Sequence, residues 1–164
     1  MSSIQTPGER KIVTFSLGKQ MFGIDMSALI EIREWEQPTP LPSVPSYIKG
    51  VTNLRGTVVP VVGLAERLGW EPSAIHARSC ILVVSIAGKQ AGFLVDEVAD
   101  IVVINEGEIQ PAPEVEALDP SIIAGLVQIT ARGADSSQSA QIHVMVSLLD
   151  LNALSLTRTL ELAA

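Results

Sequence analysis

Short runs of alternating hydrophobic and polar residues dominate the chain, and glycine and proline separate them. In the first run Val13, Phe15 and Leu17 share one face, and Gly18 follows where a type II′ turn needs a positive φ. Strands this short and this numerous predict a mainly β protein, built as small barrels or as a sandwich. The runs expected to be strands cover 12–17, 20–26, 58–64 and 80–86, with another around Val51.

The segments between these runs carry helix and loop signals. Ser27–Arg33 suits one helical turn followed by a strand, and Gly69 ends a short helix over 65–68. Prolines at alternate positions from Pro38 onward predict an extended loop up to Pro45. The remaining expected segments are a flexible N-terminus over 1–11, a polar linker over 71–79, a surface loop over 130–141, a docked helix from Asp150 onward and a tail over 156–164.

The chain contains a faint internal repeat. Gly18-Lys19-Gln20 recurs 70 positions later as Gly88-Lys89-Gln90, and Gly50-Val51 has an echo in Gly125-Leu126. A duplication explains the shared order of hairpin, proline loop and apolar strand, and chance similarity between two β-rich halves is the alternative. Two halves of this size each make a marginal core, so they are expected to pack together on one apolar interface.

The most informative stretch is Tyr47–Val62, in which two β-branched runs flank Asn53-Leu54-Arg55-Gly56. Asn53 and Gly56 suit a tight reversal between strands, because both residue types tolerate a positive φ. The reversal holds Arg55 at the mouth of an apolar hairpin. Arg55 is then either paired, because an unpaired charge in apolar surroundings is costly, or a solvated turn residue.

Composition narrows the function classes. The net charge of −7 and the 4% aromatic content argue against binding of nucleic acid, which needs a basic patch or stacking platforms. The polar N-terminus is not a signal peptide, and no apolar run approaches the roughly 20 residues of a membrane helix. These features predict a soluble cytosolic protein. The 47% hydrophobic content indicates either protein-facing surface or a Val- and Ile-rich β core.

Residues with catalytic or metal-binding chemistry are isolated in the sequence. Cys80 begins an apolar run, as a buried inert thiol does. His76 and His143 have no metal-binding neighbours in sequence, and Asp96-Glu97 would point to opposite faces of a strand. We therefore predict no enzyme activity, no metal and no cofactor. The competing hypothesis, a small-molecule barrel or an enzyme, requires a closed pocket with converging polar groups.

Several motifs resemble the CheW-like family of chemotaxis coupling proteins over about 12–154. The Lys49–Gly56 block is the most specific of them. The others are Phe22-Gly23-Ile24-Asp25, Glu31-Ile32-Arg33, Val59-Pro60-Val61-Val62, Gly92-Phe93-Leu94-Val95-Asp96 and Pro111-Ala112-Pro113-Glu114. Two departures are Gly63, where the family often has Asp, and a loop over 131–141 that is longer than usual.

The resemblance implies a mainly β fold of two five-stranded SH3-like barrels around a shared hydrophobic interface. The domain would cover 12–155, with barrel 1 roughly 12–78 and barrel 2 roughly 79–155. It also implies a non-catalytic cytoplasmic adaptor, recruited to membrane receptor arrays. Its partners would be the regulatory domain of a CheA-type histidine kinase and the cytoplasmic helical hairpin tip of chemoreceptors. An adaptor of a related pathway, governing pili, surface motility or gene expression, is the alternative.

The resemblance also implies roles for individual residues. The family's essential Arg falls on Arg55 and the Glu that pairs with it falls on Glu31, so we predict an ion pair between them. A receptor groove between the barrels would involve Arg55 and be lined by Leu29, Ile32, Gly50, Val51, Asn53 and Gly92. Glycine at two of these positions would allow close backbone approach. The residues that contact the kinase cannot be placed from this sequence.

Overall fold

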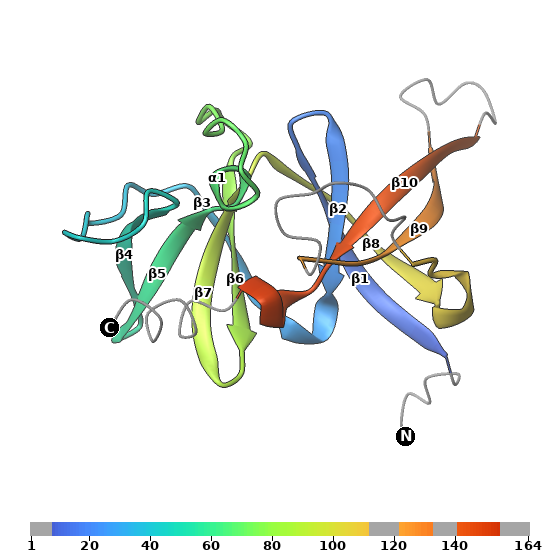
Figure 1. Ribbon diagram of the computed structural model, residues 1–164, viewed down its shortest axis with the longest axis horizontal. Coiled ribbons are helices and arrows are strands. Elements are labelled where there is room, and N and C mark those ends of the chain that lie inside the picture. The colour runs from blue at the N-terminus through green and yellow to red at the C-terminus, as the bar shows by residue number, and fades with distance from the viewer. Residues whose placement is uncertain (1–7, 112–121, 133–140, 155–164) are drawn as a thin grey trace.

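The computed structural model of the chain describes residues 8–111, 122–132 and 141–154 (Figure 1). The described residues form β1 (Glu9–Leu17), β2 (Gln20–Asp25), β3 (Leu29–Glu34), β4 (Ile48–Leu54), β5 (Thr57–Gly63), β6 (Cys80–Ile86), β7 (Lys89–Val95), β8 (Glu97–Asn105), β9 (Ile123–Arg132) and β10 (Gln141–Leu149). One short helix and three single 3₁₀ turns join them: α1 (Leu64–Arg67), η1 (Met26–Ala28), η2 (Glu106–Glu108) and η4 (Leu151–Leu154).

The strands form two five-stranded sheets that lie side by side (Figure 1). The terminal sheet has the order β8-β1-β2-β10-β9, and the central sheet has the order β3-β6-β7-β5-β4. Each sheet is antiparallel except at one junction, where β2 pairs with β10 and β7 pairs with β5 in parallel. The mainly β architecture with two five-stranded units is the one predicted.

The predicted division into barrels over 12–78 and 79–155 is wrong. The hairpin β1–β2 of the first half joins β8, β9 and β10 of the second half in one sheet, and the hairpin β6–β7 joins β3, β4 and β5 of the first half in the other. The parallel junctions make this exchange possible, because a parallel pair needs no direct hairpin connection. Linear order alone therefore did not reveal which half completes which sheet.

The strand pairing nevertheless shows the internal repeat. Gly23 pairs with Thr14 and Gly92 pairs with Val83, so these two hairpins match residue for residue. Their spacing is 69 positions, one fewer than the spacing of the Gly-Lys-Gln motifs. The shared strand order and register support duplication over chance similarity.

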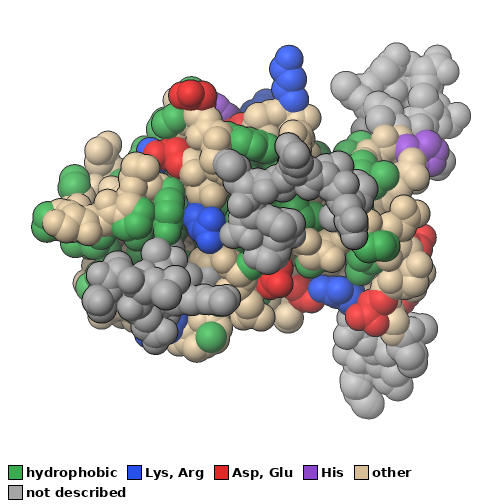
Figure 2. Space-filling model, in the orientation of Figure 1, with side chains coloured by type: hydrophobic (Ala, Val, Ile, Leu, Met, Phe, Trp, Pro, Cys, Tyr) green, Lys and Arg blue, Asp and Glu red, His purple; other side chains and the backbone are tan. Residues whose placement is uncertain are grey.

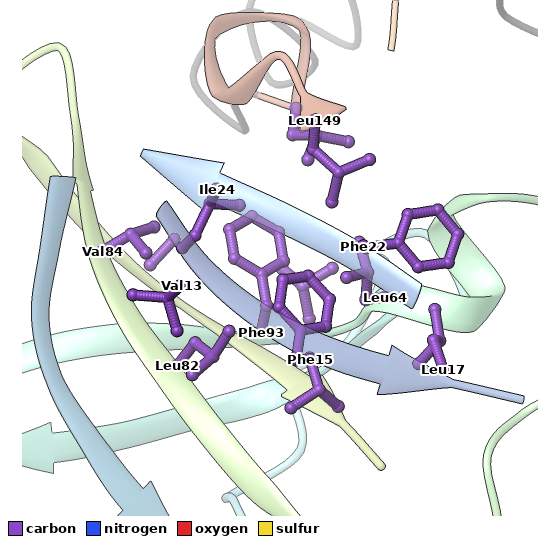
Figure 3. Close-up of a cluster of buried hydrophobic side chains, with 14 of the residues drawn as sticks. Val13, Phe15, Leu17, Phe22, Ile24, Leu64, Leu82, Val84, Phe93 and Leu149 are labelled. Atoms are coloured by element: carbon purple, nitrogen blue, oxygen red, sulfur yellow. The ribbon is translucent and has the colours of Figure 1, made fainter. Parts of the chain in front are cut away.

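The largest buried cluster lies between the two sheets. Figure 3 shows Phe15 and Phe22 of the terminal sheet together with Leu82, Val84 and Phe93 of the central sheet. Two smaller clusters fill the sheets themselves. The terminal-sheet cluster is Ile12, Ile104, Val127, Ile129, Val146 and Leu148, and the central-sheet cluster is Leu54, Val59, Val61, Ile81 and Val83. The shared apolar interface is thus the main source of burial, as expected for two small barrels.

Each sheet curls so that the segment after one edge strand reaches the other edge. Thr39, beyond β3, makes two backbone hydrogen bonds of 2.8 Å with Val51 of β4. The carbonyl of Thr39 occupies the space that a Cβ on Gly50 would need, and Gly50 has φ 146°. Only glycine fits this close approach. Gln110 and Leu126 repeat the arrangement in the terminal sheet, beside Gly125.

Most local predictions agree with the structure, and two need correction. η1 followed by β3, and α1 followed by Gly69 at φ 86°, are as expected. The flexible N-terminus over 1–11 is wrong in part, because β1 begins at Glu9 and pairs with β8. The predicted loop over 130–141 is shorter, because β9 runs to Arg132 and β10 starts at Gln141. Of the docked C-terminal helix, only the 3₁₀ turn η4 lies within the described residues.

Several expectations lie outside the described residues. They concern the N-terminal segment 1–7, the motif continuing into 112–114, the loop over 133–140 and the tail from 155 onward. Among the residues that are described, no helix has the length and apolarity to cross a membrane.

Candidate partner-binding site

The hairpin between β4 and β5 turns through two residues. Leu54 and Thr57 are the last paired residues, and Arg55 and Gly56 between them have φ of 53° and 88°. Positive φ at both central positions is the geometry of a type I′ turn, which matches the twist of the flanking strands. Asn53 tolerates a positive φ as a residue type but does not adopt one here. Asn53 instead accepts a hydrogen bond on its side-chain oxygen from the Gly56 amide, at 2.8 Å.

The Arg55 side chain forms a two-pronged ion pair with Glu31 on β3. Its Nη1 lies 2.6 Å from Glu31 Oε2, and its Nη2 lies 3.1 Å from Glu31 Oε1. A weaker contact of 3.4 Å joins Glu31 to Arg33. The Arg55 side chain is 72% exposed while that of Glu31 is 20% exposed. The guanidinium is therefore both paired and open to solvent, so the two alternatives for Arg55 are combined.

The pair changes the protonation of both groups. The hydrogen bond from Arg55, followed by its charge, holds the pKa of the Glu31 carboxyl below the usual 4.5. The same hydrogen bond and charge raise the pKa of Arg55. Both side chains are thus ionised at neutral pH, as a bidentate guanidinium–carboxylate pair requires.

The ion pair closes the central sheet. β3 and β4 are its two edge strands, and neither pairs with the other along its length. Glu31 belongs to β3, and Arg55 ends the hairpin that contains β4. The side-chain contact therefore joins the two open edges of the sheet at the hairpin tip, while Thr39 and Val51 join them further along.

Apolar side chains remain exposed on the strands that flank this pair. On β3, Ile30 and Ile32 are 43% and 45% exposed, on either side of Glu31 in the sequence. On β5, Val58 is 62% exposed and pairs with Asn53 across the hairpin. Figure 2 shows further hydrophobic side chains at the left end of the molecule, where Figure 1 places the loop before β4. We call Ile30, Ile32, Arg55 and Val58 the hairpin surface.

The exposure of Val58 could have been predicted from the sequence, because side chains of β5 alternate between the two faces of the sheet. Val59 and Val61 are fully buried, so Val58 must point to the opposite face. That face is not covered at the hairpin tip. Val62, four residues further along the same face, belongs to the buried cluster between the sheets.

The residues predicted to line a receptor groove all belong to the central sheet, and they differ in exposure. Ile32 and Asn53 are exposed, and Val51 is half-buried beside Thr39. Leu29 is half-buried and packs against the cluster between the sheets. Asn53 and Ile32, with Arg55, are the members of the predicted set that a partner can reach on the surface.

The two glycines of the predicted groove are not part of an open surface. Gly50 is buried beneath the Thr39 carbonyl. Gly92 is buried as well, and a Cβ on it would lie 2.7 Å from Cγ2 of Ile81. Both glycines allow close approach, as predicted, but the chain itself fills the space. Their expected role in lining the groove stays a prediction, to which the structure adds that both glycines are buried.

An open cleft of about 460 Å³ does lie between the sheets. Ile12, Gly23 and Asp25 come from the terminal sheet, and Ser85 and Ile86 come from the central sheet. Arg10 and Asp25 form an ion pair of 3.1 Å at this cleft. Burial alone would raise the pKa of Asp25, but hydrogen bonds from Ser27 and Arg10 outweigh it and lower the pKa. None of the predicted groove residues lines this cleft.

The acidic and thiol side chains that the sequence analysis singled out have separate surroundings. Asp96 accepts a 2.7 Å hydrogen bond from the Gly18 amide, whereas Glu97 pairs with Arg78 at 3.0 Å. Cys80 is buried, and desolvation raises the pKa of its thiol. Among the described residues, no group of three or more His, Cys, Asp or Glu side chains could hold a metal ion.

Two curled five-stranded sheets on one apolar interface, with an ion-paired hairpin at one end, define a double-barrel protein. The profile of the CheW-like domain matches residues 11–157, so this chain belongs to the CheW-like family.

Two relatives are similar to this chain over most of their own length. A probable chemotaxis protein CheW of Rhizobium etli is 36% identical over 148 residues, which covers 90% of this chain and 88% of the relative. The chemotaxis protein CheW of Rhizobium meliloti is 37% identical over 128 residues, covering 77% and 83%. Protein PilI of Pseudomonas aeruginosa is 35% identical over a shorter region, 52% of this chain and 48% of that protein.

A solved structure shares the fold. The crystal structure of the scaffolding protein TtCheW from Thermoanaerobacter tengcongensis superposes with a TM-score of 0.77 at 30% identity, covering 94% of this chain and 92% of that one. The expected pair of five-stranded SH3-like barrels is confirmed.

Proposed function

We propose that this protein is a non-catalytic adaptor that couples chemoreceptors to a CheA-type histidine kinase. The hairpin surface receives the cytoplasmic helical tip of the receptor, and a second surface, not yet placed, receives the regulatory domain of the kinase. Membership of the CheW-like family, which includes a protein described as a scaffold, supports an adaptor role.

The observation that carries the proposal is the paired but exposed guanidinium of Arg55. Glu31 occupies one side of the guanidinium, and the side chain is still 72% exposed. Arg presents five N–H donors, so donors remain for a partner after the pair with Glu31 has formed. An arginine fixed in this way keeps one orientation before binding, which lowers the entropy lost on association.

The apolar members of the hairpin surface supply the second half of the recognition. Ile32 on β3 and Val58 on β5 offer exposed aliphatic side chains, and the ion pair connects β3 to the tip of the hairpin that β4 and β5 form. An amphipathic helix can place its apolar stripe on such a surface and its polar edge against a guanidinium. The combination suits a receptor helix better than an extended or nucleic-acid partner.

The adaptor would act at the cytoplasmic face of a membrane without entering it. We propose that it is cytoplasmic and is recruited to receptor arrays through its partners. The net charge of −7 disfavours direct attraction to anionic lipid, which supports recruitment by protein contacts.

Binding of purified partners tests the proposal. Titration calorimetry would use the receptor's helical hairpin and the kinase's regulatory domain, each against the wild type and Arg55→Glu. We expect both partners to bind the wild type, and the receptor fragment to bind the variant about tenfold or more weakly, as for a central arginine of an interface. Kinase binding should be unchanged.

Arg78→Glu provides a matched control. Arg78 is 73% exposed and forms an ion pair of 3.0 Å with Glu97, so this variant makes the same change of charge at an arginine as exposed as Arg55. It should bind both partners like the wild type. Loss of receptor binding in both variants would point to net charge and contradict the assignment to the hairpin surface. Failure of the wild type to bind either partner would reject the adaptor function.

A second candidate keeps the adaptor mechanism but changes the pathway. The similarity to Protein PilI favours a related chemosensory system, such as one that governs pili or surface motility. Deletion of the gene separates the two. Loss of swimming chemotaxis alone supports the first candidate, and loss of surface motility with normal swimming supports the second.

A further inference from the structure

The Asn53 side chain makes a hydrogen bond within its own hairpin. Its Oδ1 accepts a hydrogen bond of 2.8 Å from the amide of Gly56, the second central residue of the turn. In a two-residue hairpin loop the two flanking residues form backbone hydrogen bonds with each other. The amide N–H of a central residue therefore needs a side chain or water as its hydrogen-bond acceptor. Asn53 therefore ties the tip of the turn back to β4.

A second turn of the same kind provides an internal comparison. Ala87 and Gly88, between the paired residues Ile86 and Lys89, have φ of 51° and 82°. These angles nearly equal those of Arg55 and Gly56. Ser85 occupies the position equivalent to Asn53, but in this described hairpin its side chain makes no hydrogen bond to the turn. The turn therefore adopts its shape without such a tie.

The two turns differ in what their first central residue does. The side chain of Ala87 is a single methyl group with no partner to reach, whereas the guanidinium of Arg55 contacts Glu31 on another strand. The left-handed conformation is unfavourable for a residue with a Cβ, and Arg lacks the short polar side chain by which Asn or Asp stabilises it locally. The hydrogen bond from the turn amide to an Asn side chain is therefore present in the turn whose first central residue, Arg55, contacts another strand.

We propose that Asn53 is a positioning residue, whose hydrogen bond to Gly56 fixes the turn so that Arg55 meets Glu31 in the two-pronged geometry. Asn53 then influences the partner through Arg55 and not by touching it. The part of this inference that concerns partner binding rests on the proposed function. The part that concerns the ion pair does not.

Carbon-detected NMR titration of the Glu31 carboxyl tests the ion-pair part without any partner. The variants are Asn53→Ala, the matched control Ser85→Ala, and Arg55→Ala as the reference for a lost pair. We expect the titration midpoint of Glu31 to be higher in Asn53→Ala than in the wild type and to approach its value in Arg55→Ala. In Ser85→Ala the Glu31 midpoint should equal that of the wild type. Cross-strand contacts between Leu54 and Thr57 report whether the hairpin persists.

Two results of this titration would overturn the proposal. An unchanged Glu31 midpoint in Asn53→Ala means that Arg55 is held without Asn53. A hairpin that is disordered in Asn53→Ala means that Asn53 is needed to form the turn, and not to direct Arg55.

A double-mutant cycle tests the binding part. Asn53→Ala should weaken receptor-hairpin binding about threefold or more in the wild type, and have no effect in the Glu31→Gln background, because both changes act through one pair. An equal loss in both backgrounds means direct contact with the partner and overturns the proposal. A wild type that binds no receptor fragment rejects the proposed function, and the titration still decides the role of Asn53.

Discussion

Glu31 and Arg55 join the two edges of the central sheet through hydrogen bonds of 2.6 and 3.1 Å. The pair has a structural consequence, because β3 and β4 are held together at the hairpin tip. It also has a chemical consequence, because the same guanidinium is 72% exposed and available to a partner. Exposed ion pairs contribute little to folding stability, so binding is where a defect in this pair should be measured.

The pair predicts how Glu31 titrates. Because Arg55 lowers the pKa of Glu31 in the folded protein, the stabilising contribution of the pair is complete above the ordinary value of 4.5 and is lost as pH falls through the lowered pKa. NMR titration should give a Glu31 midpoint below 4.5, and Arg55→Ala should raise it toward that value. A wild-type midpoint at or above 4.5 would contradict the two-pronged pair in solution.

Two neighbouring residues on β3 should respond in opposite ways to the same change. Ile32→Asp replaces a side chain that is 45% exposed, so it should weaken receptor binding while leaving the melting temperature nearly unchanged. Leu29→Asp introduces a charge beside the cluster between the sheets, and should cost about 2 kcal/mol or more of folding stability. Thermal unfolding and binding, measured on both variants, separate the two effects.

The Leu29 variant also tests the expectation from family resemblance that Leu29 belongs to the receptor surface. A Leu29→Asp protein that melts like the wild type but fails to bind would support that surface role. If Ile32→Asp instead unfolds the protein, the hairpin surface is part of the core.

Gly50 should be irreplaceable for a structural reason. In Gly50→Ala the new methyl group would overlap the Thr39 carbonyl, and φ of 146° is strained for alanine. We expect a loss of about 2 kcal/mol or more, measured by chemical denaturation. Gly107→Ala is the control, because Gly107 has open space around it and no positive φ. Equal stability of the two variants would show that Thr39 does not pack against Gly50 in solution.

The cluster between the sheets should make the two barrels unfold together. Phe93 is 3% exposed and lies in that cluster, so Phe93→Ala should cost about 3–5 kcal/mol. NMR signals of backbone amides in each sheet should report one coincident transition for the wild type and the variant. Val103→Ala, at a side chain 53% exposed, should change stability little. Separate transitions for the two sheets would contradict a shared core.

The local structure followed from the sequence because its causes are local. Alternation gave the strands β1 and β2, Gly69 marked the end of α1, and the proline run marked the loop before β4. The specific motif around Arg55 also indicated the family and the pairing with Glu31. These signals act over one strand or turn, where residue type alone sets the backbone preference.

The pairing between halves was decided only by tertiary structure. The repeat correctly indicated two similar units, yet β1–β2 joins the strands of the second half, since β2 pairs in parallel with β10. Parallel neighbours are far apart in sequence and leave no turn signal between them. The exposures of the predicted groove residues were decided in the same way. Thr39 covers Gly50 and Ile81 fills the space beside Gly92, so segments distant in sequence determine which residues a partner can reach.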